Sequence, residues 1–414
     1  MLRIPFQKLK SSDELTEVGK MPAFFNRLCD LLLLQCPESG DVAICWESLR
    51  TDIADTITEI ANQGVQEIKD AEPTSEDKLL YGTEMALPLL RFFQNGNRNL
   101  KAFRESQVPA TLCKMLEQDS LDTSSTDTMI SVLEALTAIS YYQPIAQAVV
   151  ELGVGRNLIH IINNSKDFRS YVVSLAIEAL WNLIEVGGQV AIEALASYPE
   201  AIPSLKNQFA QVMSKGYKKD DKCLRNEICV LMNFIVGDTQ SHENFLAGAE
   251  SGSECILESI INWGVHDEQN ANSTPIFTQT EEDLELKKLL WTQAFQVMRG
   301  PHAEKACDLA FKKKFFNTLL LFLDPKACQQ NVILSRWAQP QLIELQTHAL
   351  NILGNLVGIA QDRIYQLGGH RVLAVFLMTY EDKQRRRAVM QALLAICKHE
   401  QFRHELPMLI EPLI

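Results

Sequence analysis

The chain has 414 residues, of which 46% are hydrophobic and 22% charged, a composition typical of an ordered protein rather than a disordered one. Its formal net charge of −13 argues against nucleic acid or an anionic membrane as the main partner. The ten cysteines form no CxxC pair, and most sit within apolar helical patterns, as free thiols of a reducing compartment do. We therefore predict a soluble protein of the cytoplasm that has no metal site.

The N-terminal part begins with a polar lead-in over residues 1–20. An apolar helix is predicted over 21–34 and ends near Pro37 and Gly40, and its run of four leucines is far too short to span a bilayer. One or two further helices are predicted over 41–69. A polar segment over 70–77 then forms a loop that ends with helix-capping residues.

One amphipathic pattern recurs along the rest of the chain. Its clearest copy spans residues 172–185, where Leu180 lies at the centre of an apolar stripe when the segment is placed on a helix at about 100° per residue. The equivalent centres are separated by 40 to 64 residues, and they are Leu90, Leu136, Leu180, Leu231, Phe295, Leu353 and Leu393. Second helices with a Gly- or Pro-bearing entry lie between them. A repeat of helical units is therefore predicted.

A base period just above 40, with short helices and a glycine turn, resembles armadillo repeats, with HEAT repeats as the close alternative. One such unit cannot bury its own apolar stripe, so neighbouring units must stack. We predict an all-α, armadillo/HEAT-like α-solenoid, a superhelical array that forms a single domain over residues 21–414 with about seven to eight repeats. The longer spacings require insertions, and the clearest is a polar surface loop over 264–283.

Three asparagines, Asn182, Asn233 and Asn355, share one position of the repeat. In armadillo proteins that carry nuclear cargo, an asparagine there faces the inner groove and holds an extended peptide, and a tryptophan stands four residues earlier. Here the residues four earlier are not tryptophans, so that ladder is absent. The three asparagines are predicted to be local hydrogen-bonding groups on the concave helix, with a peptide groove as the alternative.

The basic cluster Arg385, Arg386 and Arg387 precedes an apolar run and is by default a solvated helix start, although it could dock an acidic partner. No serine or cysteine sits in a nucleophile elbow, and no Gly-rich phosphate loop follows a strand. We therefore predict no enzyme, no catalytic residue and no cofactor. The candidate protein-binding surface consists of the three asparagines and the three arginines.

Several strings resemble segments of the cilia- and flagella-associated protein 69 family, in the same order along nearly the whole chain. Three of them are Gly216-Tyr-Lys-Lys-Asp-Asp-Lys-Cys-Leu-Arg-Asn-Glu-Ile228, Glu282-Asp-Leu-Glu-Leu-Lys-Lys-Leu-Leu290 and Trp337-Ala-Gln-Pro-Gln-Leu-Ile-Glu-Leu-Gln-Thr-His-Ala-Leu350. The stretches 178–185 and 4–14 are also similar to that family. The density of these matches is highest from about residue 170 to 375.

This resemblance implies a non-catalytic structural scaffold of the motile cilium or flagellum, located in the cytoplasm, cytoskeleton and axoneme. It implies a place in the central apparatus, on the C1b projection of the central pair. The partners would be other central-apparatus proteins and, directly or indirectly, the central-pair microtubule, within a large hetero-complex that supports beating. Family members are considerably longer, so one interpretation is a partial chain. The alternative function is a soluble armadillo adaptor that binds an extended peptide or cargo in its concave groove.

Overall fold

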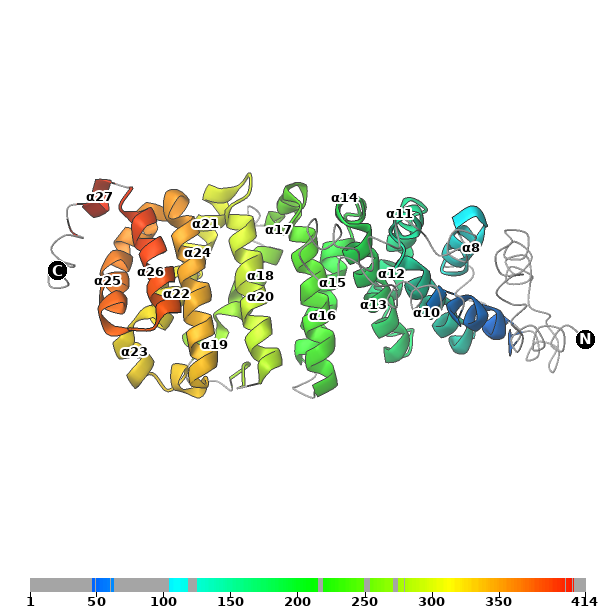
Figure 1. Ribbon diagram of the computed structural model, residues 1–414, viewed down its shortest axis with the longest axis horizontal. Helices are drawn as coiled ribbons and strands as arrows, with labels where there is room; N and C mark the ends of the chain where they lie inside the picture. Colours follow the sequence, from blue (N-terminus) through cyan, green and yellow to red (C-terminus); the bar gives the residue numbers. More distant parts are fainter. Residues whose placement is uncertain are drawn as a thin grey trace, which may run out of the picture. The chain divides into compact units, whose positions relative to one another are not determined.

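The computed structural model describes residues 47–48, 50–59, 61–62, 104–117, 125–214, 219–248, 254–270, 275–278, 280–398, 400–403 and 405. Across these ranges the regular secondary structure is helical, with no strand (Figure 1). The all-α fold class is therefore confirmed. The predicted lead-in over 1–20, the predicted helix over 21–34 and the predicted centre Leu90 lie outside the described residues.

The chain divides into two compact units, residues 1–208 and 209–414, and each is described by itself. The boundary falls inside helix α15 (Ala201–Ser214). A single array over 21–414 stays a prediction.

The first unit is a stack of helices joined by short turns. Its labelled helices before the boundary are α8 (Val108–Met115), α10 (Thr126–Ser140), α11 (Gln143–Glu151), α12 (Val154–Asn163), α13 (Ser170–Gly187) and α14 (Gln189–Ala196). The long helices α10 and α13 pack against each other, and α11 and α12 pack on α13. Helix α13 is long and apolar enough to cross a membrane, but 61% of it is buried inside the protein, as expected of a core helix.

The second unit repeats the same scheme with four long helices, α16 (Lys219–Val236), α20 (Glu281–Met298), α24 (Gln339–Gln366) and α26 (Lys383–Ile396). Each of these packs against the next, and shorter helices pack between them. The shorter helices are η1 (Thr239–Ser241), α17 (His242–Leu246), α18 (Ile256–Gly264), α19 (His266–Gln269), α21 (Ala303–Lys312), α22 (Phe315–Leu323), α23 (Pro325–Gln330), η3 (Leu334–Arg336), α25 (Gly369–Thr379) and α27 (Glu400–Arg403).

The predicted repeat centres fall in these long helices. Those in α10, α13, α16, α24 and α26 are buried, and they are Leu136, Leu180, Leu231, Leu353 and Leu393. In α20 the alignment is one residue off, because Ala294 is fully buried whereas Phe295 is only half-buried and stacks against Arg299. The period of the pattern therefore located the helices that build the core of each unit.

Local sequence signals fix where several helices begin. Gly153 (φ 82°) and Gly368 (φ 67°) adopt the left-handed conformation at the starts of α12 and α25, where a residue without Cβ is unstrained. Thr280 and Asp382 cap α20 and α26, since each side chain accepts a backbone N–H from the residue three positions later. These caps set the entry points of two helices that carry the side chains discussed below.

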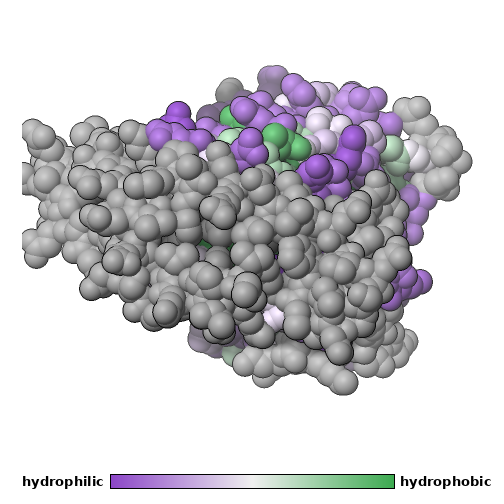
Figure 2. All heavy atoms as spheres, turned by 90° about the vertical axis from the view of Figure 1, so that its right-hand side faces the viewer, coloured by the Kyte–Doolittle hydropathy of each residue, from purple (hydrophilic) through white to green (hydrophobic). Residues whose placement is uncertain are grey.

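The segment 264–283 differs from the polar surface loop that its composition predicts. It contains helix α19, and its apolar residues Val265, Ile276 and Phe277 are buried. The carboxylate of Asp267, in the same segment, accepts the backbone N–H groups of the last two at 2.8 and 3.0 Å. The segment is held to α20 by Lys287, which donates to the carbonyl of Gly264. By contrast, the coloured residues on the face shown in Figure 2 are mostly hydrophilic, with only small hydrophobic areas between them.

Candidate protein-binding surface

A buried ion cluster joins α16 to α20. Asp283 is fully buried at the start of α20, and its carboxylate accepts hydrogen bonds from Arg225 at 2.8 Å and from Lys222 at 2.9 Å, both on α16. Thr278 donates its backbone N–H to the same carboxylate at 2.7 Å. Burial alone raises the pKa of Asp283, but these hydrogen bonds outweigh it and hold that pKa below its ordinary value. The cluster therefore fixes one helix against the next.

Neutral side chains reinforce the same joint. Asn226 on α16 donates its amide to the carbonyl of Glu282 at 2.8 Å. Gln293 on α20 reaches back to the carbonyl of Cys229 on α16 at 2.7 Å. Each bond satisfies a backbone acceptor of the neighbouring helix, so the two helices have one preferred register.

Another buried cation lies one turn beyond Asp283. Lys287 is fully buried, and its ammonium group lies 2.9 Å from the carboxylate of Glu268 and donates to the carbonyl of Gly264 at 3.1 Å. The rings of Phe277, Trp291 and Phe322 surround it at 4.5 to 5.4 Å from the ammonium nitrogen to the ring centroids. Lys287 thus anchors the segment before α20 to both α20 and α22.

Arg385 forms a third buried contact between helices. The prediction that it lies on the surface is therefore wrong. Arg385 is buried, its guanidinium donates to the side-chain oxygen of Gln346 on α24 at 2.9 Å, and it lies 3.9 Å from the ring centroid of Tyr380. Gln346 in turn donates to the carbonyl of Phe322 at 3.1 Å. The positive charge of Arg385 is therefore used to hold α26 against α24.

The three asparagines of the predicted surface have three different environments. Asn182 is buried and donates to the carbonyl of Thr137 on α10 at 2.9 Å. The prediction that it belongs to a binding surface is therefore also wrong. Asn233 is half-buried, and its side-chain oxygen has no hydrogen-bond partner among the described residues. Asn355 is exposed and donates to the carbonyl of Asn351, one turn earlier. They do not form one row of equivalent groups.

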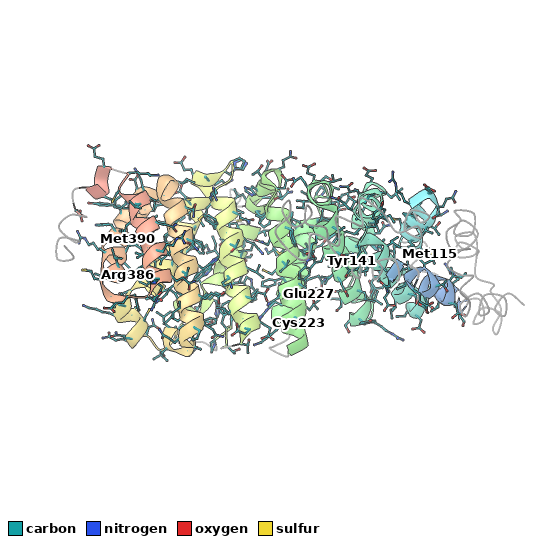
Figure 3. The ribbon with its side chains drawn as sticks, in the orientation of Figure 1. Met115, Tyr141, Cys223, Glu227, Arg386 and Met390 are labelled. Atoms are coloured by element: carbon teal, nitrogen blue, oxygen red, sulfur yellow. The ribbon has the colours of Figure 1, made fainter. Side chains whose placement is uncertain are left out.

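Arg386 and Arg387 are exposed on α26, as the sequence predicts. Arg386 donates to the carbonyl of Tyr380 at 3.2 Å, and Met390 follows one turn later (Figure 3). Met390 and Leu394 are 46% and 61% exposed, and both were missed as surface candidates. The spacing 386, 390, 394 places all three side chains on one stripe of the helix. That spacing was the available signal, although exposed and buried apolar stripes look alike in a sequence.

Several cysteine thiols of the described residues are buried. Burial raises the pKa of the Cys113 and Cys229 thiols to about 12 and that of Cys307 to about 11, so these thiols stay protonated. No group of three metal-ligating side chains occurs among the residues that the structure describes. A shallow depression of about 510 Å³ along α21 is lined by residues of both charges, and its Asp308 pairs with Arg363.

The sequence model of the family described as "Cilia- and flagella-associated protein 69, ARM repeat" matches residues 1–386. The protein of that name from Homo sapiens is 23% identical over 220 residues, which are 52% of this chain and 22% of that protein. The one from Mus musculus is 25% identical over 217 residues, with the same coverage. The aligned stretch thus spans less than a quarter of the length of these relatives.

Two solved structures can be superposed on most of the chain with low scores. One is an engineered protein, which is 15% identical, with 95% of this chain and 98% of that chain covered and a TM-score of 0.38. The other is a circular tandem repeat protein with a novel repeat topology, which is 11% identical, with 94% and 97% covered and a TM-score of 0.25. The family match is accordingly the comparison that bears on function.

Proposed function

Because the chain belongs to the armadillo-repeat family of cilia- and flagella-associated protein 69, we propose that it is a non-catalytic scaffold of the motile-cilium axoneme. Its place would be the central apparatus, on the C1b projection. There it binds other central-apparatus proteins and contacts the central-pair microtubule directly or through them. The association with cilia and flagella follows from the family, whereas the projection, the partners and the support of beating are the proposal.

The observation that best supports a scaffold is how the second unit uses its buried charges. Asp283, Lys287 and Arg385 each hold one helix of the stack against a neighbouring segment. A buried charge that is paired and hydrogen-bonded in this way fixes geometry, and breaking the pair is costly. Exposed apolar side chains such as Met390 and Leu394 remain on helices at the surface, which suits the binding of other proteins.

The alternative, a soluble adaptor with an extended peptide in a concave groove, has weaker support. Asn182, one of the three asparagines that such a groove would use, already donates its side-chain amide to the carbonyl of Thr137 inside the first unit. Asn355 is exposed but is bonded to its own helix. The side-chain oxygen of Asn233 has no partner among the described residues, but this atom is buried.

Fractionation of cilia tests the proposal. The tagged chain is expressed in ciliated cells, the cilia are demembranated, and the axonemes are washed with increasing salt. We expect the chain to stay with the axoneme at high salt and to be lost from cilia that lack the central pair. A chain that leaves with the detergent-soluble fraction and binds an extended basic peptide would instead establish the adaptor.

A further inference from the structure

The exposed stripe on α26 lies on the side of the helix that faces away from α24. Arg385 and Ala392 face α24, because Arg385 bonds Gln346 and the Ala392 backbone approaches α24 closely at a glycine. At about 100° per residue, Met390 and Leu394 point roughly the opposite way. The stripe is therefore a surface that none of the described neighbours of α26 covers.

The neighbouring helix α25 also exposes two apolar side chains. It packs against α26, and Val375 and Met378 are 40% and 39% exposed. Helix α24 packs against both of these helices, and α22 packs against α25. We call Val375, Met378, Met390 and Leu394 the α25–α26 patch. Single exposed apolar residues are ordinary, but four on two adjoining helices mark an interaction site.

Positive charge borders the patch at the start of α26. Lys383, Arg386 and Arg387 are exposed there. Asp382 is engaged by Arg385, so it does not neutralise them, and the exposed Glu381 offsets only part of their charge. On a chain with a net charge of −13, this local positive excess selects for an acidic partner.

The exposed arginine on α25 is already paired. On α25, Arg371 pairs with the carboxylate of Glu405 at 3.0 Å, and the same carboxylate accepts from Tyr365 and His370. These bonds lower the pKa of Glu405 to about 2, so Arg371 keeps its counter-ion at physiological pH.

We propose that the α25–α26 patch binds an amphipathic helix of a partner protein, with the apolar stripe of that helix on Met390 and Leu394 and its acidic flank on Arg386 and Arg387. Side chains spaced three and four residues apart on two adjoining helices form a surface of the kind into which such a stripe packs. The proposal deepens the scaffold function, and it rests on that function only in taking the occupant to be another protein.

A synthetic peptide tests the chemistry directly. The probe is a fluorescein-labelled helix of 18 residues, with leucines at helical spacing and glutamates on both flanks, and the control replaces the glutamates by lysines. Fluorescence anisotropy is measured against the 414-residue chain. We expect the acidic peptide to bind at least about tenfold more tightly than the basic one. Raising the salt from 50 to 300 mM should weaken it several-fold, because exposed charges are screened.

Matched variants locate the binding. The double variant Arg386→Glu, Arg387→Glu and the single variant Leu394→Asp should each weaken the acidic peptide about tenfold or more. Lys312→Glu and Val332→Asp are the controls, because Lys312 is exposed on α21 and Val332 is 70% exposed elsewhere in the same unit. All positions are exposed, so circular dichroism and Tm should be unchanged in every variant.

Three results would overturn the proposal: equal binding of the two peptides, binding that Leu394→Asp leaves intact, or no binding at all. Self-association of the chain that Leu394→Asp abolishes would assign the patch to a second copy instead. Binding to vesicles that contain phosphatidylserine, lost in the double arginine variant, would assign it to a membrane. If the chain stays with the axoneme but does not bind the peptide, the proposed binding at the α25–α26 patch is wrong and the scaffold function stands. If it binds the peptide but leaves the axoneme, the scaffold function is wrong and the binding at the patch stands.

Discussion

Replacing Asp283 by asparagine tests whether the ion cluster between α16 and α20 stabilises the second unit. Asparagine keeps the shape and an acceptor oxygen for the Thr278 backbone, but it removes the negative charge that Lys222 and Arg225 share. Both cations are largely buried, and both then lose the charge of Asp283. The variant therefore isolates the charge from the packing.

The expected cost is large for a single side chain. Removing one partner of a buried pair costs 3–5 kcal/mol, and we take about 3 kcal/mol because the asparagine retains one hydrogen bond. A unit of this size loses roughly 2–4 °C of Tm per kcal/mol, so a shift of about 6–12 °C is expected. Urea denaturation followed by circular dichroism measures the free energy, and calorimetry measures Tm.

The matched control is Asp308→Asn, because Asp308 is about half-exposed and also pairs with an arginine, Arg363. An exposed pair contributes no more than about 1 kcal/mol, so this variant should unfold nearly as the parent does. Equal effects of Asp283→Asn and Asp308→Asn would refute the reasoning, as would an unchanged Tm in Asp283→Asn.

The pH dependence provides a second check on the same residue. The pKa of Asp283 is lower in the folded chain than its ordinary value of 3.8. Its contribution to stability is therefore fully present above that value and is lost as the pH falls through 3.8 toward the folded pKa. The difference in stability between the parent chain and Asp283→Asn should be constant near neutral pH and shrink in acid. A difference that grows in acid would contradict the sign of the shift.

Three further predictions concern single sites. Asn182→Ala should cost about 1–3 kcal/mol, since it removes the part-buried hydrogen bond from α13 to the carbonyl of Thr137 on α10, whereas Asn355→Ala on the surface should stay within about 0.5 kcal/mol by urea denaturation. Gly300→Ala should strongly lower Tm because its Cβ would meet the His242 ring, whereas Gly358→Ala, with open space around it inside α24, should raise stability by about 0.5–1 kcal/mol. Iodoacetamide labelling with peptide mapping should modify the exposed Cys223 well before the buried thiols named above, and equal rates would contradict their burial.

The sequence by itself determined the helical class and the positions of the long helices. An amphipathic stripe is a property of residues three and four apart, so it can be read locally. The centres Leu180, Leu231 and Leu353 were found in this way, and the strings around them identified the family. Phe295 shows the limit, because a stripe two residues wide does not say which of two neighbours faces inward.

Only the tertiary structure decided which polar side chains lie inside. Asn182 and Asn355 share a repeat position, yet one bonds another helix and the other faces solvent. Arg385 and Arg386 are adjacent, yet Arg385 alone is buried against α24, and Met390 is exposed where no described helix covers it. The helix-to-helix partners of Asn182 and Arg385 lie 45 and 39 residues away along the chain. Burial of a polar side chain depends on which helix packs over its face, and the spacing of residues along one helix does not predict that packing.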